Sequence, residues 1–407
     1  MNAAASQEAL SKSVARYPVY LFFHKASYWG PVFFLYFSSL LSLADVLLLE
    51  AIYYVSVVIL EVPTGYLADR FGSRRILIAS SIAQMAACSA FALSGHFFVL
   101  AAGQTLLALG MSLSSGSDTA YHFAVIGAAN RQDEFPEREG RAARALLLSQ
   151  ATSALVGGCV AVFDLRLAYL LTLVSSLVAA SIAYRFAEVS PGREQSESVT
   201  RQLKSCIKDV RNPRLAWLLG FYIYMTVVNH IPHEFYQPFI RGLIDQAAPG
   251  VPTPAVTGIH TALTMGVATL AATLSIRLTR RIGNSWTLLL GGGIQTLIIG
   301  AMASLHSPVV AILVLLRSVP RGLMYAPLNA EIVPLIGEGR RATYLSLQSL
   351  LGRLAFGGVL IAFSRISSTG NIAEPLSLST VGAVAGLLLL AITAPLSFRA
   401  SSRASRN

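Results

Sequence analysis

Four basic residues interrupt otherwise apolar stretches of the sequence and could hold an electron-rich ligand. They are Lys25, Arg317, Arg321 and Arg353. Arg317 and Arg321 are four residues apart, which on a helix places both guanidinium groups on one face. Guanidinium groups bind carboxylates strongly, and charges within apolar segments commonly mark functional sites. We therefore predict that these four residues line a cavity for an anionic or electron-rich cargo.

Acidic residues in the same stretches could bind a proton, or could neutralise the basic residues in fixed ion pairs. Burial favours the protonated form of a carboxyl group, so Glu61 and Glu234 are candidates for proton coupling. Glu61, Glu234 and Glu331 are equally possible partners of the basic residues. Asp118 is expected to pair with an arginine of the gate.

A polar run, "NHIPHEFYQPF" (229–239), combines histidine, glutamate, tyrosine and glutamine. The helical zinc motif spaces two histidines four residues apart, whereas these are three apart, so we predict no metal site. Pro232 is expected to break the helix and expose His230, Glu234 and Gln237 to cargo or protons. The alternative is a polar cap at the outer membrane interface. Aromatic side chains at 28, 29, 33 and 36, beginning with Tyr28, are predicted to face an apolar cavity.

The stretch "EVPTGYLADRFGSRR" (61–75) concentrates charges in a chain that is only 13% charged. Glycines permit a tight turn and close helix ends, and an aspartate can accept hydrogen bonds from a helix N-terminus. The arginines could pair with Asp133, Glu134 or Glu137. We predict a breakable latch rather than a plain basic anchor. Its candidate residues are Gly65, Asp69, Arg70, Gly72, Arg74 and Arg75, with Asp118, Arg141 and Arg340 from other segments.

The elements that carry these residues are long apolar blocks. The 407-residue chain is 54% hydrophobic, with a mean hydropathy of +0.60. Blocks of about 20 residues match the roughly 30 Å of a bilayer core. Twelve are predicted: 17–40, 44–67, 76–94, 97–117, 142–163, 167–186, 214–240, 255–278, 285–305, 308–328, 342–362 and 376–397. The sequence thus predicts an all-α integral membrane protein with twelve transmembrane helices.

The basic residues predict the orientation of the chain. The loops between successive spans lie on alternate sides of the membrane. Of 31 Lys and Arg residues, four fall within spans, and only three (Arg166, Arg241 and Arg365) fall in the loops on the side opposite to the termini. The remainder lie on the other side, which predicts that both termini are cytoplasmic. The net charge of +11 then reflects topology and anionic lipid, and no nucleic-acid partner is expected. The first span lacks a cleavage site and is predicted to be retained.

The chain contains one long polar segment and one internal repeat. Residues 187–213 separate six predicted spans from six, which predicts halves 1–186 and 214–407 joined by a cytoplasmic linker. Residues 139–158, "EGRAARALLLSQATSALVGG", match 338–357, "EGRRATYLSLQSLLGRLAFG", at eight of twenty positions. Two pseudo-symmetric six-helix halves are an architecture of secondary transporters.

The stretch "GYLADRFGSRR" resembles the loop motif between the second and third helices of the major facilitator superfamily. Gly65, Asp69, Arg70, Gly72 and the two following arginines match. "EVPT", "SGSDTA" (115–120) and "RATYLSL" (341–347) are similar to a subgroup of bacterial members. The second-half counterpart "RLTRRIGNSW" is degenerate, with Arg280 in place of the aspartate. The resemblance implies the superfamily fold, a conformational gate at the loop and location in a bacterial inner membrane.

Together these features predict a monomeric secondary transporter that works by alternating access. Absence of a nucleotide-binding loop argues against an ATP pump, and no cofactor is expected. We expect proton-coupled export of a small organic compound. This cargo could be drug-like or a secondary metabolite, and it could be an anion. Alternatives are an uptake permease, or a non-transporting sensor or membrane-embedded enzyme on the same scaffold. Apart from 230–234, the sequence offers no convergent catalytic groups, so the chain is predicted not to be an enzyme.

Overall fold

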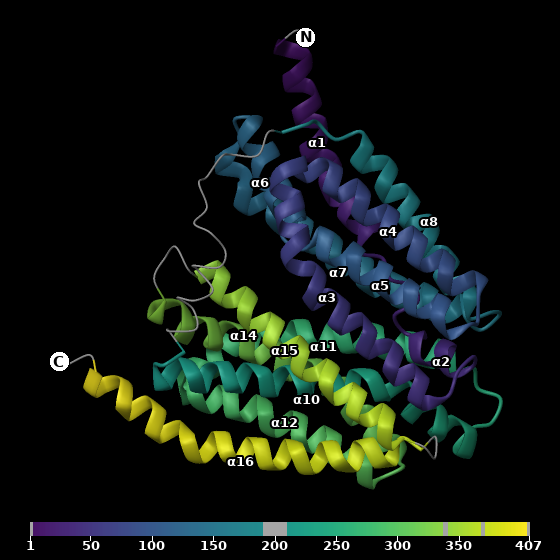
Figure 1. Cartoon of the computed structure of the whole chain (residues 1–407), viewed down its shortest axis with the longest axis vertical. Coiled ribbons are helices and arrows are strands. Elements are labelled where there is room, and N and C mark those ends of the chain that lie inside the picture. Colours follow the sequence, from purple (N-terminus) through teal and green to yellow (C-terminus); the bar gives the residue numbers. More distant parts are fainter. Residues whose placement is uncertain (1–2, 190–209, 337–340, 368–370, 405–407) are drawn as a thin grey trace. The chain divides into compact units, whose positions relative to one another are not determined.

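A computed structural model describes residues 3–189, 210–336, 341–367 and 371–404. Within these ranges the secondary structure is helical, without strands (Figure 1). Eleven of the described helical segments are long and apolar enough to cross a membrane. They confirm the prediction of an all-α integral membrane protein. The first predicted span is not among the eleven because its helix ends at His24 and resumes only at Phe33.

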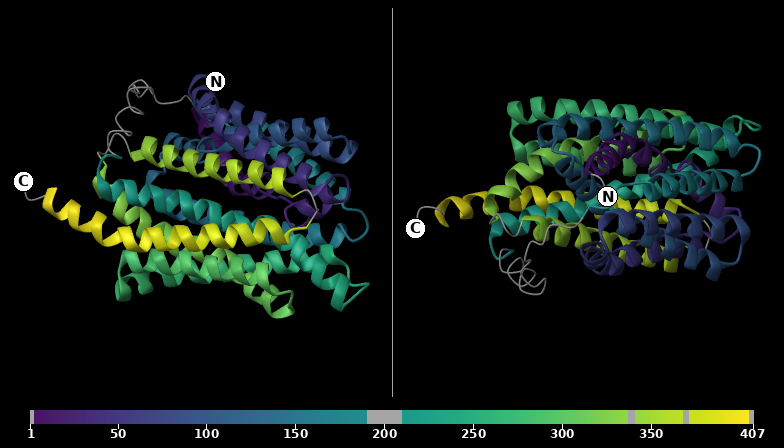
Figure 2. Two further views of the ribbon diagram at one scale, coloured as in Figure 1. Left: turned by 60° about the horizontal axis from the view of Figure 1, so that its bottom comes forward. Right: turned by 90° about the horizontal axis from the view of Figure 1, so that it is seen from above.

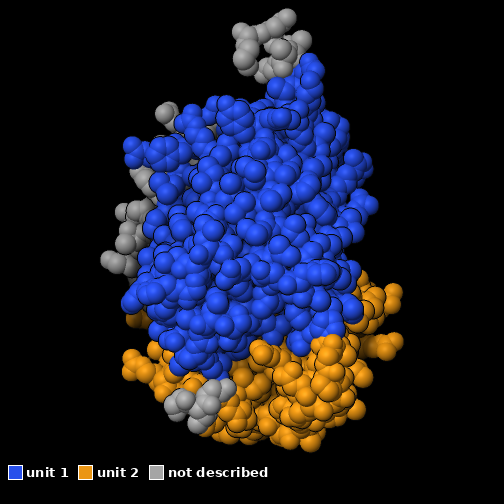
Figure 3. Space-filling model, turned by 90° about the vertical axis from the view of Figure 1, so that its right-hand side faces the viewer, with its two compact units in different colours: residues 1–193, 252–262 blue, residues 194–251, 263–407 orange. Residues whose placement is uncertain are grey.

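Helical contacts divide the chain into two compact units, coloured separately in Figure 3. Unit 1 comprises residues 1–193 and 252–262, and unit 2 comprises 194–251 and 263–407. The predicted halves, 1–186 and 214–407, are not tested by this division and stay a prediction. Most of the predicted linker, 190–209, lies outside the described residues.

Unit 1 is a bundle of helices whose apolar faces pack against one another. In it, α4 packs on α5 and α8, α3 on α5, and α1 on α7 and α8. An aromatic cluster of Phe33, Tyr36, Phe37, Phe91 and Tyr169 fills one end of the bundle. Its elements are α1 (Ala3–His24), α2 (Phe33–Ser38), α3 (Leu43–Phe71), α4 (Ser73–Leu93), α5 (Phe97–Ser114), α6 (Ser117–Ala128), η1 (Gln132–Glu134), α7 (Phe135–Val160) and α8 (Arg166–Tyr184).

Unit 2 is a second bundle, in which α12 packs on α14 and α16, and α10 on α15 and α16 (Figure 2). The first repeat copy, 139–158, falls on α7, and the described part of the second copy, 341–357, falls on α15. The elements of this part of the chain are α10 (Pro213–Ala247), α11 (Thr253–Ile282), α12 (Asn284–Ser304), α13 (Pro308–Val314), η2 (Leu315–Ser318), α14 (Val319–Ile332), η3 (Val333–Leu335), α15 (Arg341–Ile366) and α16 (Ala373–Ala404).

Three predicted spans are interrupted. The seventh span, in which Pro232 predicted a break, is not one of them. The first breaks after His24, the fourth at Ser115–Gly116 between α5 and α6, and the tenth passes through the 3₁₀ segment η2. By contrast, α10 runs unbroken through Pro232, so the predicted break there is wrong. A proline removes one backbone hydrogen bond, but a membrane helix tolerates this when neighbouring groups satisfy the freed carbonyl.

Equivalent tight turns join the second span to the third and the eighth to the ninth. Gly72 lies between α3 and α4 with φ +82°, and Gly283 lies between α11 and α12 with φ +85°. Residues with a Cβ atom are strained at such positive φ values, whereas glycine is not. The degenerate second-half motif therefore retains the turn although its charges differ.

Candidate functional site

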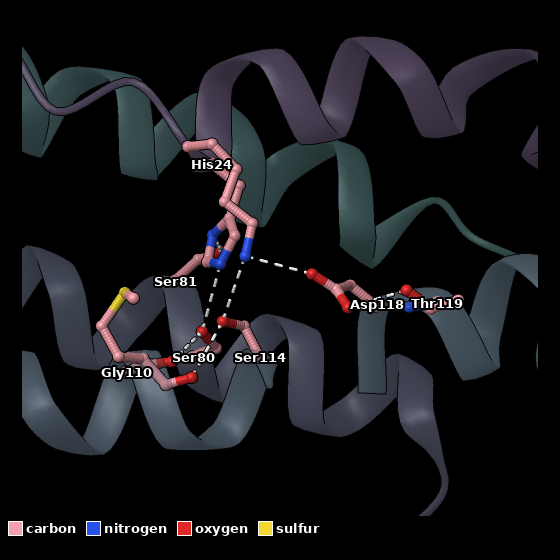
Figure 4. Close-up of polar contacts among 9 residues, drawn as sticks. His24, Ser80, Ser81, Gly110, Ser114, Asp118 and Thr119 are labelled. Carbon is pink, nitrogen blue, oxygen red and sulfur yellow. Dashed lines mark hydrogen bonds and ion pairs between the residues drawn. The ribbon is translucent and has the colours of Figure 1, made fainter. Parts of the chain in front are cut away.

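An ion pair lies where two interrupted spans of unit 1 meet (Figure 4). The Nζ of Lys25, one residue after α1, is 3.0 Å from Oδ2 of Asp118. The side chains are 22% and 14% exposed, respectively. Asp118 lies in the first turn of α6, where the helix dipole favours an anion, and its Oδ1 accepts from the amide of Thr119 at 2.8 Å. The structure therefore gives Lys25 a carboxylate partner, and gives Asp118 a lysine rather than a gate arginine.

The ion pair is one side of a larger polar cluster that the sequence alone did not delineate. Lys25 also donates to Oγ of Ser114 at 3.4 Å, the last residue of α5. Next to it, the buried imidazole of His24 lies 3.3 Å from Oγ of Ser80 and 3.2 Å from Oγ of Ser81 (Figure 4). Ser80 in turn donates to the carbonyl of Gly110 at 2.6 Å. The breaks in α1 and α5 are thus linked through side chains of α4.

The non-helical segment after α1 is held in place by α7 and α8. The amide of Tyr28 donates to Oγ1 of Thr172 at 3.1 Å. On the other side, Gly157 approaches so closely that a Cβ atom there would overlap the carbonyl of Tyr28. One of the paired glycines noted in the sequence therefore fits against an interrupted span.

The predicted aromatic lining is only partly available to a cavity. Tyr28 and Trp29 are half-buried, whereas Phe33 and Tyr36 are 4% and 2% exposed within the aromatic core. The prediction that all four line a cavity is therefore wrong for Phe33 and Tyr36, which pack against Trp29 and Tyr169 instead.

The predicted gate loop lies at the turn between α3 and α4. Gly65 and Asp69 lie in the last part of α3, and Arg70 is exposed there. Arg74 donates to the carbonyl of Tyr184 at 2.5 Å.

The basic pair at the start of α4 contacts a glutamate just after α8. Both Arg74 and Arg75 reach Glu188, at 3.8 and 3.2 Å. The proposed acidic partners Asp133, Glu134 and Glu137 are not among the described contacts of these arginines. The loop is instead attached to the chain just after α8.

The acidic residues near η1 form local ion pairs of their own. Glu134 accepts from Arg131 at 2.6 Å and from Arg138 at 2.9 Å. The hydrogen bonds from Arg131 and then Arg138 lower the pKa of Glu134 from 4.5 to about 2. Arg141 pairs with Glu137 at 2.6 Å within α7. Arg340, predicted to be the counterpart of Arg141, lies outside the described residues.

In unit 2, Arg317 is the buried cation that the sequence predicted. It lies in η2, is 4% exposed, and donates to Oγ1 of Thr264 at 2.7 Å. Its guanidinium carbon lies 4.0 Å from the ring centroid of Tyr236. Such cation–π contact stabilises a desolvated guanidinium. Arg321 lies beyond η2 in α14 and is exposed, so Arg317 and Arg321 do not share one environment.

The other candidates of unit 2 are dispersed along its helices. His230 is hydrogen-bonded through Nδ1 to the carbonyl of Thr226 at 2.6 Å, and its ring contacts Phe356. Gln237 donates to the hydroxyl of Tyr236 at 3.2 Å. Glu234 is buried, and Arg353 is half-buried in α15.

Glu331 has a different role from the one considered for it. It forms an ion pair with Arg214 and accepts from Asn284 at 2.6 Å. These contacts join the starts of α10 and α12 to the end of α14. Glu331 therefore binds the ends of three helices together, and its described partner is Arg214 rather than Arg317 or Arg321.

A buried carboxyl group that the sequence analysis did not single out lies on α3. Glu50 is 8% exposed, and its Oε1 accepts from Nε2 of Gln104 at 2.9 Å. The signal was a glutamate at the seventh position of the predicted span 44–67. Glu61, the predicted proton carrier on the same helix, is half-buried. Among the described residues no group of three or more potential metal ligands gathers.

Two helical bundles with charged groups at interrupted spans define a polytopic membrane transporter. A family model, the Major Facilitator Superfamily, matches residues 19–360. The chain belongs to that superfamily, as the loop motif indicated. It is accordingly a membrane transporter of small molecules rather than an enzyme.

Solved structures share the fold at low sequence identity. The nucleoside transporter NupG has a TM-score of 0.78 and 13% identity, over 96% of this chain and 99% of that one. A peptide transporter POT in complex with sulfate has a TM-score of 0.74 and 16% identity, over 96% and 95%. A POT family transporter in complex with 5-aminolevulinic acid has a TM-score of 0.72 and 12% identity, over 95% and 96%. No curated protein matches the chain.

Proposed function

We propose that this protein is a proton-coupled secondary transporter that exports a small organic compound by alternating access. The observation that carries the proposal is the Lys25–Asp118 ion pair, located where the first and fourth spans are both interrupted. Interrupted membrane helices expose backbone and side-chain polar groups that a solute or an ion can bind. An ion pair that is 3.0 Å long and largely buried can be opened and closed as such a site is filled and emptied.

The cargo that these residues favour is small, electron-rich and partly apolar. Arg317 supplies a buried cation next to the face of Tyr236, and Tyr28 is a half-buried aromatic in the other unit. Lys25, His230, Gln237, Arg321 and Arg353 remain proposed cargo contacts. Glu61 and Glu234 remain proposed proton carriers, because a carboxyl group in an apolar span is a common means of coupling a proton to transport.

The gate is proposed to be the α3–α4 loop. Gly72 forms the turn, and the paired arginines attach it to Glu188. Asp69→Asn should reduce transport strongly without preventing membrane insertion, because it removes a charge from an element that must alternate between two states. We further propose that the protein is a monomer in the bacterial inner membrane, with both termini on the cytoplasmic side.

Uptake of a small organic solute is the second candidate. The names of similar structures, a nucleoside transporter and peptide transporters, are consistent with solutes that carry hydrogen-bonding groups. An experiment is therefore required to determine the direction of transport.

The test is transport by the purified protein in liposomes. Labelled nucleosides, dipeptides, aromatic carboxylates and lipophilic cations would be added outside, with an acidic lumen, an acidic exterior or no pH gradient. If the protein exchanges protons for cargo, an acidic lumen drives accumulation. Accumulation driven only by an acidic exterior would identify a symporter and overturn export by proton exchange. Lack of any response to pH gradients across all compounds would contradict proton coupling.

A further inference from the structure

The carboxyl group of Glu50 lies inside unit 1. Glu50 is on α3, whereas Lys25 follows α1 and Asp118 lies on α6. Glu50 is seven residues into α3, and its partner Gln104 is seven residues into α5. At 1.5 Å per residue, each lies about 10 Å from the start of its helix. Both side chains are buried, at 8% and 3% exposed, and α3 packs closely against α5. The contact is therefore a polar one within the apolar part of the bundle.

Glu50 differs from Asp118 and Glu331 in what it contacts. Asp118 pairs with Lys25, and Glu331 pairs with Arg214. The described partner of Glu50 is the neutral amide of Gln104, which engages Oε1 alone. Among the described residues, no hydrogen bond or ion pair engages Oε2. A carboxylate in an apolar span is stable when a cation compensates it or when a proton neutralises it, and here a neutral amide is in contact.

The surroundings of Glu50 supply further neutral groups rather than cations. Tyr169 on α8 is close enough to interact with the charge of Glu50, and its buried hydroxyl has no described hydrogen-bond partner. Other titratable groups that interact with Tyr169 are Cys88 on α4 and Tyr36 on α2. Beyond Tyr36, Arg166 and Asp164 interact with that tyrosine. On α3 itself the nearby titratable residues are Asp45, whose carboxylate is bonded to Ser42 at 2.7 Å, and Tyr53 and Tyr54.

We propose that Glu50 is a proton-binding site of this transporter, with Gln104 as the residue that positions it. In the loaded form an O–H bond forms at Oε2, the oxygen that Gln104 does not engage, and Oε1 remains the carbonyl that accepts from Nε2. In the unloaded form the proton returns to water and the carboxylate keeps the amide hydrogen bond. The buried hydroxyl of Tyr169 is a polar group that can stabilise Oε2 when the proton leaves.

A purely structural hydrogen bond between α3 and α5 does not require an acid. A glutamine at position 50 would offer the same carbonyl oxygen to Gln104 without the cost of burying an ionisable group. The acid adds one capability, which is to take up and release a proton at a fixed place in the bundle. Glu50 and a glutamine at the same position therefore differ in proton binding, while both can form the hydrogen bond between α3 and α5.

The inference rests on the proton-coupled transport proposed above, but its first test needs no cargo. The probe is the proton itself, applied to the full-length protein in liposomes. Infrared difference spectra between acidic and alkaline buffer report the C=O stretch of protonated carboxylic acids. We expect one such band to be absent from Glu50→Gln and retained in Glu8→Gln, a control at an exposed glutamate paired with Lys12. Spectra of Glu50→Gln identical to those of the wild type would overturn the proposal.

A second variant tests the positioning role of Gln104 and covers the case in which Glu50→Gln does not fold. In Gln104→Leu the Glu50 band should persist but move to higher frequency, because the carbonyl has lost its hydrogen-bond donor. Glu50→Asp should likewise retain an acid band at a changed frequency. An unmoved band in Gln104→Leu would refute the assigned contact.

Transport then separates this inference from the proposed function. Using a compound that the wild-type protein transports, Glu50→Gln should still exchange cargo across the membrane but lose the response to a pH gradient. If the wild type itself shows no such response, proton coupling fails while the infrared assignment of Glu50 stands. If wild type and Glu50→Gln respond equally, the Glu50 assignment fails and proton coupling stands.

Discussion

Breaking the Lys25–Asp118 ion pair should destabilise the protein unequally from its two ends. Lys25→Met removes the ammonium but leaves Asp118 with the amide of Thr119 at 2.8 Å and with the dipole at the start of α6. Asp118→Asn removes the carboxylate charge and leaves the ammonium of Lys25 with Ser114 at 3.4 Å as its described partner. The carboxylate therefore has better residual contacts than the ammonium, so the aspartate substitution should cost more.

The magnitude follows from the geometry. Two unit charges 3.0 Å apart attract by about 5.5 kcal/mol at an effective dielectric constant of about 20. Desolvation offsets part of this, and breaking a buried pair from one side typically costs about 3–5 kcal/mol. We expect about 3–4 kcal/mol for Asp118→Asn. For Lys25→Met we expect about 1–2 kcal/mol, because the helix dipole and the Thr119 amide retain part of the stabilisation of the carboxylate.

The assay is equilibrium unfolding of the purified protein in lipid–detergent micelles, with both single variants and the double variant. The double variant should be more stable than the sum of the singles predicts, with a coupling of about 1–3 kcal/mol. Additive losses, or a larger loss for Lys25→Met than for Asp118→Asn, would refute the reasoning. The matched control is Lys12→Met, which removes a lysine from an exposed ion pair with Glu8 and should cost at most about 0.5 kcal/mol.

Three further predictions follow from particular residues. Gly72→Ala and Gly283→Ala should each destabilise by about 1–2 kcal/mol because φ is positive at both, whereas Gly140→Ala, in open space within α7, should be neutral or stabilising in the same unfolding assay. Gly157→Ala should destabilise by about 1–3 kcal/mol and impair transport, since the new methyl group overlaps the carbonyl of Tyr28; transport and stability equal to wild type would contradict the close approach. The folded-state pKa of Glu134 is lowered to about 2 from 4.5, so its contribution is fully present above about pH 4.5 and is lost as the pH falls toward 2; the difference in unfolding temperature between wild type and Glu134→Gln should shrink over that window, and a difference that is constant from pH 7 to 3 would refute the ion-pair assignment.

Much of the architecture was predictable because it depends on local properties of the chain. The length and apolarity of a block decide whether a segment can cross a bilayer, and both are read along one dimension. The loop around Gly72 was recognisable for a similar reason. A turn with positive φ requires glycine whatever surrounds it, so Gly72 and Gly283 mark the same turn although the charges beside them differ.

The partners of the charged residues were decided by the tertiary structure. The sequence offered Lys25 as a cargo contact and Asp118 as a partner for an arginine, but the breaks after His24 and at Gly116 bring these two together. Arg74 and Arg75 could have reached several acidic residues, and the packing of α4 on α8 selects Glu188. Pro232 predicted a break that α10 does not have.

The physical reason lies in the range of the interactions. Whether a helix breaks at a proline or at a polar pair depends on which neighbouring groups satisfy the freed backbone, and those neighbours come from distant parts of the sequence. Whether a buried carboxyl group contacts a cation or an amide also depends on packing. For this reason the sequence alone could not distinguish Glu50 from any other single polar residue in an apolar block. The sequence by itself therefore determined that the chain is a membrane-spanning helical transporter, and the packing of its helices determined which charges meet inside it.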